Sequence, residues 1–152
     1  MPNFHPLLTH FPVALLSFAL LAEWAARALG RDELSRAGWW TQAAGSAGLA
    51  AAALTGMLAS NAVPIAPAGK PYMEIHQEIA FVSCTVFAVL LFWRIAARTK
   101  LPAHRETAFL LLFTAGVLAL WAGAWYGGEM VFRFGAGVQP IPPPASSPPL
   151  IP

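Results

Sequence analysis

The stretch TAFLLLFTAGVLALWAGAWYGG, residues 107–128, decides the fold class because it carries no charged side chain over a length that crosses a bilayer. A transmembrane helix needs about 20 predominantly apolar residues. Three other stretches meet this requirement, at about 6–29, 37–63 and from just after Pro71 to 97. With the fourth span beginning near 103, the chain is predicted to be all-α, a bundle of four transmembrane helices.

The composition supports a single membrane domain. Of the 152 residues, 57% are hydrophobic and 11% are charged, whereas roughly 25% of the residues in a soluble domain are charged. The net charge of +2 is too small to suggest a nucleic-acid partner. Cys84 is the one cysteine, so an intramolecular disulfide and covalent c-type haem attachment are both excluded. We predict a transmembrane domain over residues 1–137 and a disordered tail over 138–152, which holds half of the prolines.

Basic residues predict the orientation of the bundle. Seven of the nine lie in or beside the connections between spans 1 and 2 and between spans 3 and 4, namely Arg27, Arg31, Arg36, Arg94, Arg98, Lys100 and Arg105. Only Lys70 and Arg133 lie on the other side. Cytoplasmic loops carry the excess of Lys and Arg, so both termini are predicted to face outward. In a bacterium this means the inner membrane, with the termini in the periplasm.

Three histidines are predicted to lie at that outer face. His5 and His10 belong to the segment HPLLTHFP, residues 5–12, and His76 opens the third span. His10 and His76 follow Pro6 and Pro71 closely, which places both at a depth of about 6–8 Å at 1.5 Å per residue. Ionisable side chains at membrane depth are usually functional, and imidazole is a common ligand of haem iron. We predict that His10 and His76 converge, with His5 at the rim.

Small residues follow each of these two histidines at the same offsets. Ala14 and Ser17 follow His10, and Ala80 and Ser83 follow His76, by four and seven residues on one helical face. Small residues below a histidine leave a slot, and a flat macrocycle held between two axial imidazoles needs such a slot. The matching offsets also suggest that the chain consists of two related hairpins. However, stripes of small residues also pack membrane helices without any cofactor. The second and fourth spans carry two further stripes of this kind, Ala44, Gly48, Ala52, Gly56 and Gly116, Gly123, Gly127.

Charged residues near the outer face are candidate supporting groups. Glu78 and Glu129 can orient a histidine or ligate a metal themselves. Arg133 can neutralise a haem propionate. At the other face, Glu23 is expected either to reach the interface or to pair with Arg27 at the four-residue spacing.

The motifs also resemble a known family. These are His5-Pro6, His10-Phe11-Pro12, His76, Tyr126-Gly127-Gly128 and Gly135-x-Gly137-Val138. Over residues 3–138 the chain resembles the small four-helix membrane proteins catalogued as domain of unknown function 2231, a name that implies no activity. The architecture is also similar to membrane b-type cytochromes, which hold haem between paired histidines on neighbouring helices. That similarity implies His10 and His76 as axial ligands, with no second pair near the inner face.

The leading functional prediction is a minimal transmembrane b-type cytochrome that binds haem b. It would pass electrons between a quinol or another membrane donor and an outer-face acceptor, so we expect an electron-transfer protein rather than a catalyst. Two alternatives stay open. The same histidines, with Glu78 or Glu129, can hold or transport a metal ion, or the chain is a scaffold subunit whose small stripes and tail are its functional surfaces. The stripes also suit a homodimer.

Overall fold

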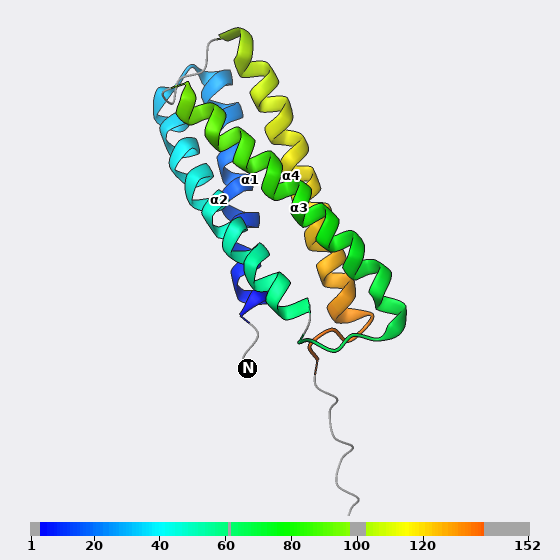
Figure 1. Cartoon of the computed structure of the whole chain (residues 1–152). Helices are drawn as coiled ribbons and strands as arrows, with labels where there is room; N and C mark the ends of the chain where they lie inside the picture. Colours follow the sequence, from blue (N-terminus) through cyan, green and yellow to red (C-terminus); the bar gives the residue numbers. More distant parts are fainter. Residues whose placement is uncertain (1–3, 61, 98–102, 139–152) are drawn as a thin grey trace, which may run out of the picture.

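Four long helices make up the described part of the chain. The computed structural model describes residues 4–60, 62–97 and 103–138. Its elements are α1 (His5–Leu29), α2 (Asp32–Ser60), the short 3-10 helix η1 (Pro67–Gly69), α3 (Lys70–Ala96) and α4 (Ala103–Phe132) (Figure 1). Within these residues there is no strand, so the predicted all-α bundle of four helices is confirmed. Of the predicted tail, only Val138 lies among the described residues.

Local sequence explains where the helices begin and end. Pro6 lies in the first turn of α1, where its missing N–H is not needed. Gly30 ends α1 in the left-handed conformation, with φ 63°, and its N–H donates to the Ala26 carbonyl. The second helix begins at Asp32, earlier than hydropathy alone predicts, because Asp32 and Glu33 in its first turn interact favourably with the helix dipole.

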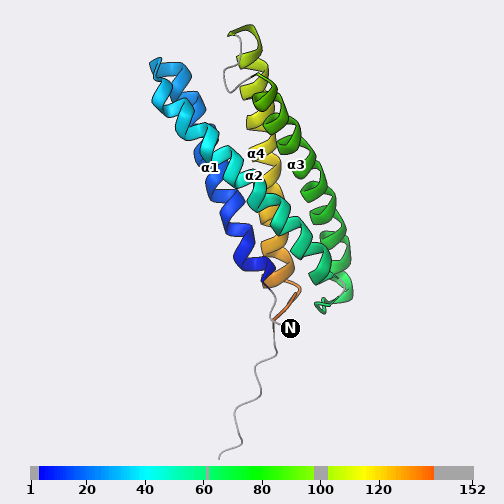
Figure 2. The same cartoon turned by 60° about the vertical axis from the view of Figure 1, so that its left-hand side comes forward.

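The helices form a four-membered ring in which each neighbour runs antiparallel to the next. α1 packs mainly on α2 and α3 mainly on α4, and the α1–α4 and α2–α3 seams close the ring (Figures 1 and 2). α1 and α3 therefore face each other diagonally. The starts of α1 and α3 and the ends of α2 and α4 lie together at what we call the histidine end. The other end is called the opposite end.

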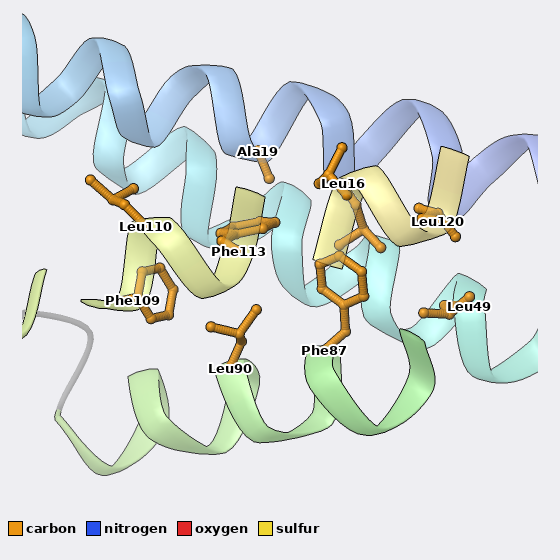
Figure 3. Close-up of a cluster of buried hydrophobic side chains, with 10 residues drawn as sticks. Leu16, Ala19, Leu49, Phe87, Leu90, Phe109, Leu110, Phe113 and Leu120 are labelled. Atoms are coloured by element: carbon orange, nitrogen blue, oxygen red, sulfur yellow. The ribbon is translucent and has the colours of Figure 1, made fainter. Parts of the chain in front are cut away.

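The centre of the bundle is apolar, and so is its outside. The core cluster comprises Leu16, Ala19, Leu49, Phe87, Leu90, Phe109, Leu110, Phe113, Val117 and Leu120 (Figure 3). Large apolar side chains also cover the exterior, among them Leu58, Phe81 and Phe92 at 70% exposure or more. All four helices are long and apolar enough to cross a membrane. The chain is therefore an integral membrane protein whose outer surface faces lipid.

The core shows that the two hairpins are related by a shift of 71 residues. On α1 and α3, the buried Leu16 and Ala19 correspond to Phe87 and Leu90. On α2 and α4, the buried Leu49 corresponds to Leu120. Contacts repeat as well as positions: a Cβ built on Gly45 would meet the Leu16 side chain, and one built on the equivalent Gly116 would meet Val86 and the Phe87 ring. The bundle is therefore an approximate twofold arrangement of two hairpins about its long axis, as in parallel membrane repeats.

Candidate functional site

His5, the first residue of α1, is held against α2. Its Nδ1 lies 2.9 Å from the Ala52 carbonyl oxygen and 3.4 Å from the Thr55 hydroxyl. The imidazole lies against Gly56, where an added Cβ would come within 2.9 Å of its Cε1 atom. A half-buried ring is thus fixed by a backbone carbonyl and by the absence of a side chain at residue 56.

His76 repeats this arrangement on α3 and α4. Its Nδ1 lies 2.8 Å from the Gly123 carbonyl oxygen, and its ring lies against Gly127. Ala52 and Gly123 each lie 47 residues after the histidine that they bind. A carbonyl oxygen can only accept, so each neutral imidazole carries its proton on Nδ1 and its lone pair on Nε2. Histidines that ligate a metal through Nε2 commonly donate their other ring N–H to a backbone carbonyl in this way.

The two imidazoles meet across the bundle axis. Their ring centres lie 6.3 Å apart, and the ring planes are inclined by 84°. Two imidazoles that bind one ion from opposite sides at about 2.0–2.1 Å have ring centres about 6 Å apart. The observed separation of the ring centres is of this size.

A cavity of about 70 Å³ extends from this pair toward the core. Its lining is small or aliphatic apart from the two rings: Thr9, Pro12, Val13, Leu49, Ala52, Ala53, Ile79, Ala80, Ser83, Leu120, Gly123 and Ala124. The Ser83 hydroxyl is buried and has no hydrogen-bond partner among the described residues. Thr9, the other hydroxyl residue of the lining, donates to the Pro6 carbonyl of its own helix, so the cavity offers one unpaired hydroxyl, that of Ser83, in a largely apolar space.

His10 does not take part in this pair, which corrects the predicted partner of His76. Its ring is exposed, and its Nδ1 bonds to the Pro6 carbonyl of its own helix at 2.7 Å. The residue equivalent to His10 on α3 is Phe81, which is 76% exposed. Both positions therefore face outward in their hairpins, and it is His5 that meets His76.

The other predicted site residues divide between the cavity and the surface. Ala80 and Ser83 line the cavity beside His76. Ala14 is exposed, and Ser17 accepts a hydrogen bond from Trp121 in the α1–α4 seam at 2.9 Å. The residues predicted to form a slot below His10 are thus not part of the cavity.

The charged candidates lie away from the two imidazoles. Glu78 is exposed and does not line the cavity. Glu129 lies 3.4 Å from Arg133, whose guanidinium also stacks over Phe134. No group of three or more His, Cys, Asp or Glu side chains that could hold a metal occurs within residues 4–60, 62–97 and 103–138. The candidate ligands that the described residues bring together are therefore the two imidazoles of His5 and His76.

At the opposite end, the same two helices carry a buried ion pair that sequence reasoning missed. Glu23 and Arg94, on α1 and α3, are equivalent positions in the two hairpins, and their side chains form an ion pair with little exposure. Arg94 also donates to the Ser35 carbonyl at 2.9 Å and to its hydroxyl at 3.0 Å. Gln42 Oε1 lies 3.4 Å from Arg94. Three helices are thus joined by one buried polar network.

Glu23 therefore does not pair with Arg27, which corrects that prediction. Arg27 instead lies 3.1 Å from Glu106 on α4. Glu23 can point inward because Gly38 leaves room for it; a Cβ there would overlap the carboxylate. The four-residue spacing predicted a local pair, but packing of α3 brings a distant arginine to the same carboxylate.

Comparison with known proteins identifies a family and no characterised relative. A family model described as "Predicted membrane protein (DUF2231)" matches residues 1–140, in agreement with the resemblance of the motifs. No curated protein and no solved structure matches the chain.

Proposed function

The chain belongs to the DUF2231 family of predicted membrane proteins, and from that premise we propose that it is a minimal transmembrane b-type cytochrome. His5 and His76 are the proposed axial ligands of haem b. The observation that carries the proposal is the pair of imidazoles at 6.3 Å, each with Nδ1 held by a backbone carbonyl.

The number of ligands favours haem over a bare ion. A structural zinc ion takes four protein ligands and a catalytic one takes three, whereas the described residues bring two histidines together. Haem supplies four ring nitrogens itself, so two imidazoles complete the six positions around iron. Iron with both axial positions filled supplies reversible one-electron chemistry rather than oxygen binding.

The protein's own part is to orient the ligands and to make room. The Ala52 and Gly123 carbonyls fix the tautomer and direction of each ring. The cavity of about 70 Å³ is smaller than a macrocycle, so the proposal requires the side chains that line it to move apart while the two imidazoles keep their separation.

The distribution of basic residues supports an outward orientation of the histidine end. We place this end at the periplasmic face of a bacterial inner membrane, where the bound group would exchange electrons with a membrane donor and an outer acceptor. Arg133, exposed at this end, is suited to neutralise a propionate.

Visible spectroscopy of the purified protein tests the proposal. Protein from haem-replete cells should show a Soret band and, after reduction, a sharp α-band. His5→Ala and His76→Ala should each abolish both bands, whereas His10→Ala, five residues further along the same helix and exposed, should leave them unchanged. Colourless wild-type protein would overturn the proposal. Loss of the bands in His10→Ala but not in His5→Ala would restore His10 as the ligand.

A second candidate, a site for a bare transition-metal ion, is favoured by the size of the cavity. A volume of about 70 Å³ accommodates an ion and a few small ligands without such a movement of the lining side chains. Metal analysis of the same samples separates the two candidates. Stoichiometric zinc, copper or iron without haem, lost in both His5→Ala and His76→Ala, would favour the bare ion.

A further inference from the structure

A second cavity opens between α2 and α3, on the side of the bundle. It has a volume of about 270 Å³, and its lining is Ala43, Ser46, Ala47, Leu49, Ala50, Cys84, Phe87, Ala88, Leu91 and Phe92. Ala50 and Ala88, one from each helix, are exposed on the outer surface of the bundle. Since that surface faces lipid, we call this cavity the lateral groove. It is accessible from the membrane rather than from water.

The approximate twofold symmetry shows what fills the equivalent place in the α1–α4 seam. The residues 71 positions from Ala50 and Ala88 are Trp121 and Ser17. There the Trp121 indole N–H donates to the Ser17 hydroxyl at 2.9 Å, so an aromatic ring joins the two helices. In the lateral groove both positions are alanine. The groove is therefore a space of aromatic-ring size that this chain fills on one side of the bundle and leaves open on the other.

The lateral groove also contains a hydrogen-bonding group that the other seam lacks. The Ser46 hydroxyl is buried and has no hydrogen-bond partner among the described residues. Its equivalent in α4 is Val117, which has no such group. An unpaired buried hydroxyl costs free energy, and a ligand with a carbonyl oxygen would satisfy it. The groove thus offers an apolar slot for a ring and one hydroxyl for an acceptor.

The lateral groove lies beside the histidine pair. Leu49 lines both cavities. On α3, Ser83 lines the histidine cavity while the next residue, Cys84, lines the groove. A ligand in the groove would therefore be separated from a group bound between His5 and His76 by about one layer of side chains.

We infer that the lateral groove binds the ring of a lipid-soluble quinone, with a ring carbonyl accepting a hydrogen bond from Ser46. Such a molecule combines a flat apolar ring, a carbonyl acceptor and a partition into the bilayer. A lipid acyl chain would leave the Ser46 hydroxyl unpaired, and it needs no space of ring shape. The role of the quinone as an electron-carrying partner rests on the proposed cytochrome function, but its binding to the groove does not.

Direct binding tests the inference on the full chain. A decyl-substituted benzoquinone is titrated into purified protein in detergent, and heat of binding is measured by calorimetry. Ala50→Trp, which recreates in the groove the residue that fills the other seam, should abolish binding. Leu58→Trp, on the same helix at a lipid-facing position, should leave it unchanged. Ser46→Ala removes one oxygen atom and should weaken binding by about 2–10-fold, the effect of one net hydrogen bond.

The outcomes separate this inference from the proposed cytochrome. Quinone binding by colourless protein would support the groove and overturn the cytochrome, whereas a haem spectrum without quinone binding would do the reverse. Unchanged affinity in both Ala50→Trp and Ser46→Ala would overturn the groove as the binding site. Native mass spectrometry tests whether a phospholipid or a second copy of the chain occupies the groove instead. If the wild type does not bind quinone, and Ala50→Trp removes a co-purified phospholipid or a dimer, the inference is overturned.

Discussion

The two ends of the bundle place equivalent residues of α1 and α3 face to face, but with different chemistry. At the histidine end the equivalent residues are both histidine, His5 and His76. At the opposite end they are Glu23 and Arg94. Two imidazoles that each donate from Nδ1 carry a lone pair on Nε2, which is the atom through which histidine ligates a metal. Opposite charges satisfy each other. The same helix arrangement thus places two identical residues together as the candidate site at one end, and two oppositely charged residues together as an ion pair at the other.

The difference predicts separate consequences for the two ends. Removing one partner of a buried ion pair leaves an uncompensated charge, which is strongly destabilising. Removing a histidine leaves no buried charge. Substitutions at the opposite end should therefore change the free energy of unfolding, while those at the histidine end should change ligand binding.

The largest expected effect is that of Arg94→Met. It leaves the Glu23 carboxylate buried without its partner and should lower the free energy of unfolding by about 3–5 kcal/mol. Denaturant unfolding in detergent, followed by tryptophan fluorescence, measures the change. Arg133→Met is the control. The Arg133 side chain is exposed in its pair with Glu129, so its removal should change the free energy of unfolding by at most about 1 kcal/mol.

The companion double variant sharpens this expectation. Glu23→Met combined with Arg94→Met removes both charges and should recover much of the loss, since apolar replacement of a buried pair is often neutral. If the double variant were as unstable as Arg94→Met alone, the buried charge would not be the cause.

A smaller loss is expected from Gly38→Ala. The added Cβ would overlap the Glu23 carboxylate and force it away from Arg94. Overpacking of this kind typically costs about 1–3 kcal/mol. Gly128→Ala is the matched control on α4, because its added Cβ has no neighbour within 4 Å. Unfolding of the two variants under the same conditions should separate them, and equal stability would show that Glu23 has another way to reach Arg94.

At the histidine end, Gly56→Ala tests the position of the His5 ring. A Cβ at residue 56 would lie 2.9 Å from the His5 ring, and one at Gly127 would lie 3.3 Å from the His76 ring. We expect ligand affinity to fall about tenfold in Gly56→Ala, equivalent to about 1.4 kcal/mol, and less in Gly127→Ala. Haem or metal titration of the purified variants measures this, with Gly128→Ala again as control. A larger effect of Gly127→Ala would contradict the clearances around the two glycines.

The transmembrane spans could be predicted because hydropathy is a property of consecutive residues. The partner of His76 could not be predicted in this way, because it depends on the direction in which each side chain faces. Depth counted from Pro6 and Pro71 fixes how far a residue lies along its helix, but not which way it faces. His10 and Phe81 share an outward direction, and this appears once the hairpins are aligned by 71 residues. The sequence does carry that signal: Ala25-Ala26-Arg27 matches Ala96-Ala97-Arg98, and Ala44-Gly45 matches Ala115-Gly116.

The Glu23–Arg94 pair could not be predicted in the same way. Local spacing offered Arg27 as a partner for Glu23, and nothing in the sequence says that α3 brings Arg94 to the same point. Gly38, which makes room for the carboxylate, reads in the sequence as one more small residue in a membrane helix. Such contacts depend on the relative rotation of helices from different hairpins, which only the packed core determines.

The smallest expected effect, that of Gly48→Ala, tests the twofold equivalence itself. The residue equivalent to Gly48 in the other hairpin is Ala119, and a Cβ on Gly48 would lie 3.6 Å from Phe11 and Pro12, an ordinary contact. Stability should change by no more than about 0.5 kcal/mol in either direction. Gly45→Ala is the contrast, because its Cβ would approach Leu16 to 2.8 Å and should cost about 1–3 kcal/mol. Thermal unfolding of both variants in one detergent compares them. A large loss in Gly48→Ala would mean that the hairpins tolerate different side chains at equivalent positions, so that the pairing of His5 with His76 would rest on its own contacts and not on the repeat.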